Sequence, residues 1–291
     1  MKGMAGLIIV TCKKTVQNTH CETMKLIFSL FKKRELLWQF LVRNIKARHR
    51  GSILGAFWLI ANPLLMLSLY VFAFGVVFGG RFTDSPDEST LDYAIGVFIG
   101  LNVLSLISGV IGSSPGVIVS QPNFVKKVVF PLEILPTAQV GALGYDLLIG
   151  MALSLCGVTL LGPGLSLSCL YIPILVGPVF LIALGLSWFF SSFGVFIRDL
   201  SHLGSFLGLA LLYASGVFYS AEKARETAPQ IWQFLQWNPL LQMIDGLRNV
   251  ILWGGEPDWF AVLYTWLFGI LSLFLGGWFF NRLRPAFADV L

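Results

Sequence analysis

Long apolar stretches separated by short polar segments run through most of the chain. A membrane-crossing helix needs about 20 consecutive apolar residues. Six stretches reach or approach that length and predict spans over about 53–78, 93–119, 137–161, 168–197, 203–219 and 259–280. The fifth stretch is short, and Pro173 and Pro178 in the fourth favour a tilt, a kink or a short extra helix at its start. The pattern predicts an all-α integral membrane protein with six transmembrane helices.

The residues before the first span show helical rather than continuous hydrophobicity. One face of this segment carries Leu30, Leu37, Trp38, Leu41 and Ile45, and the other carries Lys33, Arg43 and Lys46. This spacing predicts an amphipathic helix over 24–50 that lies in the membrane interface. A disordered basic tail fits poorly, because large apolar residues are too dense. Residues 1–23 are expected to be a flexible extension, since Met24 is as good a start as Met1.

The segment before the last span, 229–254, is neither a clean span nor an ordinary loop. It is apolar and aromatic, and Asn238-Pro239 interrupts it. Two short helices broken at this pair would enter the outer leaflet and return, which requires cover by protein or a watery cavity. An amphipathic helix on the outer surface is the alternative. Asp245 and Arg248 lie one helical turn apart and predict an ion pair that shapes an outer gate.

Composition and charge support a membrane location and set its orientation. Hydrophobic residues make up 56% of the 291 residues and charged residues only 12%, about half the charged share of a soluble domain. The predicted spans place 16 of the 20 Lys and Arg residues on one side. Because positive loops stay in the cytoplasm, both termini are expected there. The four Cys and three His are scattered and predict no metal site or disulfide.

The loop between the second and third predicted spans is a candidate for contact with another protein. Pro122 and Pro131 bracket a short helix within 122–135, because proline suits a first helical turn and ends a continuing helix. A short stiff helix between two spans would act as a lever, although a loop that only anchors topology has the same charge. Elsewhere, Asp146 is an acid deep within a span, with no partner evident from the sequence.

Several motifs together resemble one family. Arg43 is followed by Arg50-Gly51-Ser52-x-Leu54-Gly55-x-x-Trp58 and then Asn62-Pro63, and the loop reads Asn123-x-Val125-Lys126-Lys127-Val128-x-Phe130-Pro131-x-Glu133-x-Leu135-Pro136. With Trp237-Asn238-Pro239, this set resembles the membrane subunits of polysaccharide ABC exporters. These are type-2 ABC permeases that move O-antigen, capsule or teichoic-acid polymers. The resemblance covers Met24 to the C-terminus.

The resemblance implies a homodimer in the bacterial inner membrane that pairs with two cytoplasmic ABC ATPase subunits. No G-x-x-x-x-G-K-[ST] occurs in the chain, so ATP and Mg would bind the partner and this chain would carry no cofactor. The ATPase contact would include Phe124, Lys126, Lys127, Val128, Phe130 and Glu133. The interfacial segment, a candidate for ATPase contact and for the lipid diphosphate, would contribute Arg43, Lys46, Arg48, Arg50 and Gly51, because guanidinium groups match phosphate geometry.

The expected substrate is a polyprenyl-diphosphate-linked polysaccharide, with membrane lipid around the protein and no nucleic-acid partner. Sugars stack on aromatic rings, so the candidate path residues are Tyr70, Phe74, Tyr213, Phe218, Tyr219, Trp232 and Trp237; singly, each also fits a lipid-facing position. Three alternatives stay open: an ABC exporter of drugs or small lipids, a polyprenyl-lipid glycosyl- or acyltransferase, and an ion-coupled carrier. Scattered acids disfavour the enzyme, and a single mid-span acid disfavours the carrier.

Overall fold

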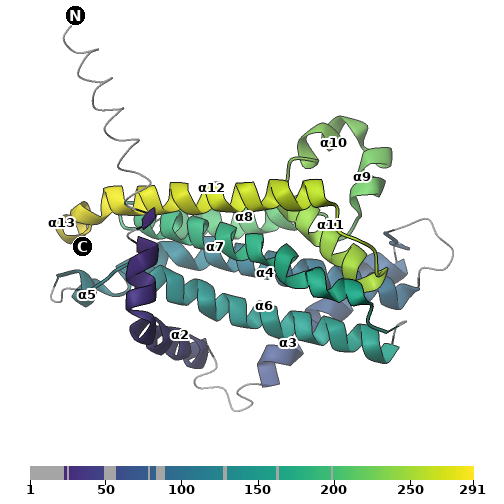
Figure 1. Ribbon diagram of the computed structural model, residues 1–291, viewed down its shortest axis with the longest axis horizontal. Coiled ribbons are helices and arrows are strands. Elements are labelled where there is room, and N and C mark those ends of the chain that lie inside the picture. The colour runs from purple at the N-terminus through teal and green to yellow at the C-terminus, as the bar shows by residue number, and fades with distance from the viewer. Residues whose placement is uncertain are drawn as a thin grey trace, which may run out of the picture.

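The computed structural model is a bundle of helices and describes residues 23–24, 26–48, 57–77, 79–82, 89–126, 130–161, 164–197 and 199–291 (Figure 1). No β-strand occurs within these ranges. The elements are α2 (Arg34–Arg48), α3 (Trp58–Tyr70), η2 (Val71–Val77), α4 (Thr90–Val119), α5 (Pro122–Lys126), α6 (Ile134–Leu161), η3 (Leu167–Tyr171), α7 (Ile172–Gly194), α8 (Leu200–Ala214), α9 (Ala221–Thr227), α10 (Pro229–Leu235), α11 (Pro239–Leu252), α12 (Trp259–Leu283), η4 (Arg284–Ala286) and α13 (Phe287–Val290).

Four helical segments of the described chain are long and apolar enough to cross a membrane. They are Thr90–Val119, Ile134–Leu160, Leu167–Gly194 and Trp259–Val290. The first predicted span corresponds to a shorter apolar helix, Ile60–Phe74, which continues from α3 into the π-helical turns of η2. The fifth corresponds to α8, which has 15 residues. The structure therefore supports a membrane protein with four candidate spans, and the six-span count stays a prediction.

The helix boundaries follow local signals. Ser89 caps α4, accepting from the Asp92 amide while the Asp92 carboxylate accepts from the Ser89 amide, so α4 begins three residues before the predicted 93. α8 ends at Ala214, before the predicted 219, because the chain turns at Gly216 with φ +70°. The short extra helix considered for the fourth span is η3, a 3₁₀-helix that precedes α7.

Helix α4 forms the centre of the bundle and packs against α6, α7, α8 and α11, while α12 packs along α7. The core contains paired hydroxyl groups as well as apolar side chains. Ser114 of α4 and Ser187 of α7 are fully buried, with their Oγ atoms 2.9 Å apart. The indole of Trp188 donates to Thr137 Oγ1 on α6 at 3.2 Å. Such bonds satisfy polar groups where lipid offers no partner.

Glycines allow two helix pairs to approach at backbone distance. A Cβ atom at Gly276 of α12 would overlap the carbonyl oxygen of Gly185 on α7. A Cβ atom at Gly204 of α8 would lie 2.7 Å from the Cα atom of Gly112 on α4. Such small residues let helix backbones pack closely where lipid gives no hydrophobic drive for association.

The bundle has two distinct ends (Figure 1). One, here called the α5 end, holds α5, α13 and the C-terminus. The other, the α11 end, carries α9, α10 and α11, and α9 and α10 project away from the long helices. The break between α10 and α11 falls at Asn238, whose side chain accepts from the Leu240 amide at 3.0 Å. The predicted break at Asn238-Pro239 is confirmed, and re-entry into the membrane stays a prediction.

Candidate functional site

At the α5 end, an aromatic cluster joins the N-terminal helix to the loop between α4 and α6. The rings of Phe40, Phe124 and Phe130 lie with centroids 4.6–5.6 Å apart. The Arg43 guanidinium lies 4.2 Å from the Phe40 ring centroid, and its Nη2 donates to Gln121 Oε1 at 3.4 Å. Phe124 and Phe130 of the loop therefore pack beside Arg43 of α2, so three of the predicted contact residues lie together.

The helix expected between Pro122 and Pro131 begins at Pro122, and α5 has five residues. Within α5, Lys126 is exposed, as is Lys46 on α2. The predicted residues Lys127 and Val128 lie outside the described part of the chain, and so do Arg50 and Gly51.

Glu133 connects three segments at the same end. Its carboxylate is buried, accepts from Ser29 Oγ at 2.8 Å, and lies 3.2 Å from Arg284 Nη1. Ser29 belongs to the helical turns before α2, and Arg284 begins η4 after α12. Because Glu133 is 2% exposed, its carboxylate supports the surface that Phe124 and Lys126 form instead of being part of it.

The acid inside the third predicted span has a partner that the sequence did not reveal. Arg48 Nη1 forms an ion pair with Asp146 Oδ2. The two side chains are 31% and 37% exposed, so the pair lies on the surface of this single chain. It joins the end of α2 to the middle of α6. Pairing lowers the cost of a charge at membrane depth.

Five of the seven predicted path residues gather in one place. Phe74 and Phe218 stack with centroids 4.2 Å apart, and Tyr70 lies 5.3 Å from Phe218. Tyr213 lies 6.4 Å from Phe218, and the Tyr219 hydroxyl donates to the Tyr213 carbonyl oxygen at 2.7 Å. This aromatic cluster joins α3 and η2 to the end of α8, segments more than 130 residues apart. Tyr213 is 58% exposed, so the cluster reaches the surface of the chain.

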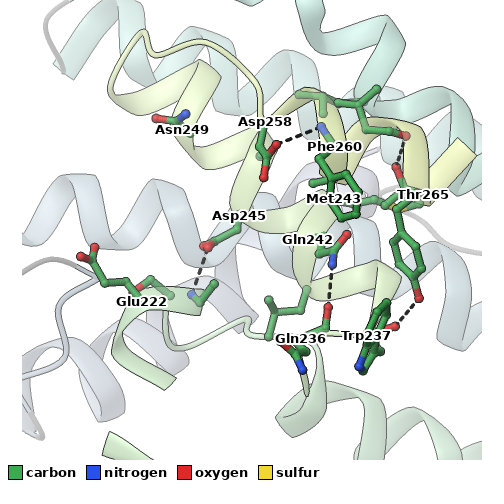
Figure 2. Close-up of a pocket in the computed structure, with 18 of the residues that line it drawn as sticks. Glu222, Gln236, Trp237, Gln242, Met243, Asp245, Asn249, Asp258, Phe260 and Thr265 are labelled. Atoms are coloured by element: carbon green, nitrogen blue, oxygen red, sulfur yellow. Dashed lines mark hydrogen bonds between the residues drawn. The ribbon is translucent and has the colours of Figure 1, made fainter. Parts of the chain in front are cut away.

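The other two path residues, Trp232 and Trp237, line a separate pocket of about 1040 Å³ at the α11 end (Figure 2). The pocket lies between α9–α11 and the start of α12. Its polar lining includes Asp92, Glu222, Gln236, Gln242, Asp245, Asn249 and Asp258, and its aromatic lining also includes Trp253, Phe260 and Tyr264. Most of these residues could not be identified from the sequence, because the pocket forms only when α9, α10 and α11 fold onto α12. Trp232 in α10 and Trp237 just after it were the available signal in the sequence.

Beneath this pocket, Arg248 is fully buried and holds the α11 end together. Its guanidinium lies 3.9 Å from the Phe82 ring centroid and 3.7 Å from Asp245 Oδ1. It also donates to four backbone carbonyl oxygens, those of Gly96, Gly216, Val217 and Tyr219. The predicted pair with Asp245 is present. However, Arg248 makes more contacts with carbonyl oxygens than with Asp245. Three of these oxygens belong to the segment after α8, and the fourth belongs to Gly96 in α4.

Asp245 lies between that guanidinium and the pocket. Its Oδ2 accepts from the Ala221 amide at 3.0 Å. Burial raises the pKa of the Asp245 carboxyl above its ordinary value; Arg248 and the Ala221 amide oppose the rise, and Glu222 adds to it. The Asp245 carboxyl therefore faces the pocket and loses its proton less readily than an ordinary aspartic acid.

The long apolar helices are those of a membrane protein. Residues 35–252 match the ABC-2 type transporter family, and the chain belongs to that family.

Two of its relatives carry a more particular description. Over 271 residues the chain is 26% identical to the O-antigen export system permease protein RfbA of Klebsiella pneumoniae, covering 92% of this chain and 100% of that protein. Over 266 residues it is 24% identical to the RfbA permease of Myxococcus xanthus, covering 91% and 99%.

Proposed function

We propose that this chain is the transmembrane subunit of an ATP-driven exporter that moves lipid-linked polysaccharide of the O-antigen type across the inner membrane. The observation that carries the proposal is the similarity, over more than nine-tenths of the chain, to permeases named for O-antigen export. The ABC-2 family match over 35–252 is consistent with it. Nothing among the described residues favours the drug-exporter or enzyme alternatives over this one.

The energy for transport would come from a separate chain. The sequence has no P-loop, so the exporter would consist of two copies of this protein and two ABC ATPase subunits that bind ATP and Mg. The α5 end supplies a surface suited to such a partner, because Phe124 and Lys126 lie beside α2 there. That end would face the cytoplasm, together with both termini.

The substrate would meet two kinds of group on its way. Arg48 and Arg50 would bind the diphosphate of the lipid carrier near the cytoplasmic surface, since guanidinium forks match phosphate oxygens. The aromatic cluster around Phe74 and Phe218 would give the glycan a surface on which sugar rings slide, because its rings offer apolar faces and Tyr213 brings the cluster to the surface of the chain. In this account the protein acts mechanically and performs no covalent chemistry.

Deletion of the gene, followed by complementation, tests the proposal. Cells without the chain should lose surface polysaccharide on electrophoresis of cell-envelope extracts and should accumulate lipid-linked glycan on the cytoplasmic side. The wild-type gene should restore export. Unchanged surface polysaccharide in the deletion strain, with sensitivity to small lipophilic drugs instead, would favour the alternative exporter.

A further inference from the structure

The pocket at the α11 end has a lining that distinguishes it from the aromatic cluster (Figure 2). Aromatic side chains form part of its wall, and Trp237 is 60% and Phe260 74% exposed. Its volume of about 1040 Å³ slightly exceeds the usual range for ligand sites, about 300–1,000 Å³. It is therefore large enough to hold more than one sugar ring.

The pocket offers hydrogen-bond acceptors more than donors. Gln242 donates to the Gln236 carbonyl at 2.6 Å and Asn249 to the Glu256 carbonyl at 2.8 Å. The hydroxyl of Tyr264 likewise donates to the Trp237 carbonyl at 2.6 Å. These amide and hydroxyl hydrogens are therefore used within the protein, and the carboxylates of the lining are the groups that can accept from a ligand.

Charge narrows the class of ligand. Four carboxylates line the pocket, those of Asp92, Glu222, Asp245 and Asp258, and none of its described lining residues is Lys, Arg or His. Phosphate and uronic-acid groups would be repelled here. Among the described residues, no three His, Cys, Asp or Glu side chains gather closely enough to hold a metal ion. Aromatic faces combined with acceptor oxygens suit a molecule that has C–H faces and many hydroxyl donors.

We propose that this pocket binds uncharged sugar residues of the exported glycan, at a point separate from the aromatic cluster of Phe74 and Phe218. The inference rests on the proposed function and adds where, and by which chemistry, the glycan is held at the α11 end. Trp237 supplies a stacking face, and the carboxylates accept from sugar hydroxyls. The diphosphate of the carrier is excluded from the pocket by the same acids.

Photo-cross-linking in exporting cells tests the proposal. The photoreactive amino acid p-benzoyl-phenylalanine replaces Phe260, which lines the pocket, or Phe268, which lies two turns further along α12 and does not. Radiolabelled glycan should cross-link at 260 at least about tenfold more than at 268. Trp237→Ala should lower the yield about tenfold, equivalent to about 1.4 kcal/mol, and Trp237→Tyr should retain most of it.

A binding experiment tests the charge argument. Neutral glycan fragments from the same cells are compared with fragments whose primary hydroxyls have been oxidised to carboxylates, using the purified protein in nanodiscs. The oxidised fragments should bind at least about tenfold more weakly. This difference should shrink in the Glu222→Gln/Asp258→Asn variant, in which Asn still caps α12. Equal binding of both fragments by the wild-type protein would overturn the assignment.

Export and binding separate the two levels of the proposal. If surface polysaccharide is lost on gene deletion but position 260 cross-links only phospholipid, or nothing, the sugar site is wrong while the exporter function stands. If deletion leaves the polysaccharide unchanged, the exporter function itself fails.

Discussion

Replacing Arg248 tests whether the carbonyl contacts or the ion pair holds the α11 end together. Methionine in place of Arg248 keeps a long side chain but removes the charge and every donor. The buried guanidinium donates to four carbonyl oxygens, which belong to Gly96, Gly216, Val217 and Tyr219. After the substitution these oxygens face an apolar side chain in a site that water does not reach.

The expected cost follows from these contacts. Breaking a buried, hydrogen-bonded charge costs about 3–5 kcal/mol, because the remaining partners stay unsatisfied. Asp245 contributes less, since its Oδ1 lies 3.7 Å from Arg248 Nη1. Its Oδ2 contact with the Ala221 amide would survive in Asp245→Asn. We therefore expect a loss of about 4 kcal/mol for Arg248→Met and about 1 kcal/mol or less for Asp245→Asn.

The free energy of unfolding in mixed micelles, titrated with SDS, measures both changes and their double-mutant cycle. The double variant should match Arg248→Met within about 1 kcal/mol, because the ion pair contributes little. Arg225→Met, at an exposed cation of α9, is the matched control and should change stability by no more than about 0.5 kcal/mol. If Asp245→Asn costs as much as Arg248→Met, the ion pair and not the set of carbonyl contacts stabilises the α11 end.

Three further outcomes follow. Because the pKa of Asp245 is raised in the folded protein, its stabilising contribution is present at low pH and is lost as pH rises through the folded-state value; unfolding of Asp245→Asn should lack this fall. Gly276→Ala should destabilise the protein through overlap with Gly185, whereas Gly116→Ala, with open space around it, should be neutral or stabilising by up to about 1 kcal/mol. Glu133→Gln should lower export more than it lowers the amount of protein in the membrane, because the carboxylate positions the surface formed by Phe124 and Lys126. If ATP hydrolysis stays coupled to export in this variant, Glu133 does not have that positioning role.

Much of the membrane architecture could be predicted from the sequence because the bilayer imposes a simple length and polarity rule. The spans assigned to 93–119, 137–161, 168–197 and 259–280 all correspond to long apolar helices of the structure. Their ends differ by a few residues, for reasons that are local. Ser89 and Asp92 form a capping box, a pattern that is visible in the sequence and moves the start of α4.

The tertiary environment of charged residues could not be predicted in the same way. Asp245 and Arg248 share a helix, so their pairing follows from spacing. Arg48 and Asp146 are 98 residues apart, and only packing of α2 on α6 brings them together. The backbone partners of Arg248 are carbonyl oxygens, which every residue has, so no side-chain pattern marks them.

The pocket illustrates the same limit. Trp232 and Trp237 were recognisable as aromatic residues in a broken helical segment, yet their joint lining with Phe260 depends on how α10 and α11 fold onto α12. The burial of Glu133 was also hidden, because its partner Arg284 lies beyond the last span that the sequence predicts, 259–280. Periodicity predicts which residues share a face of one helix, and it does not predict which helices meet.

Whether this chain works with a separate ATPase is tested most directly by affinity purification in detergent from cells that express the neighbouring genes. We expect a stoichiometric ABC ATPase in the purified complex, with less of it retained when Phe124, Lys126 and Phe130 are replaced together. Leu271→Ala, at an exposed position of α12 remote from the α5-end contacts, should leave retention unchanged. A well-folded, export-competent permease that purifies without any nucleotide-binding partner would show that export does not depend on a separate ATPase.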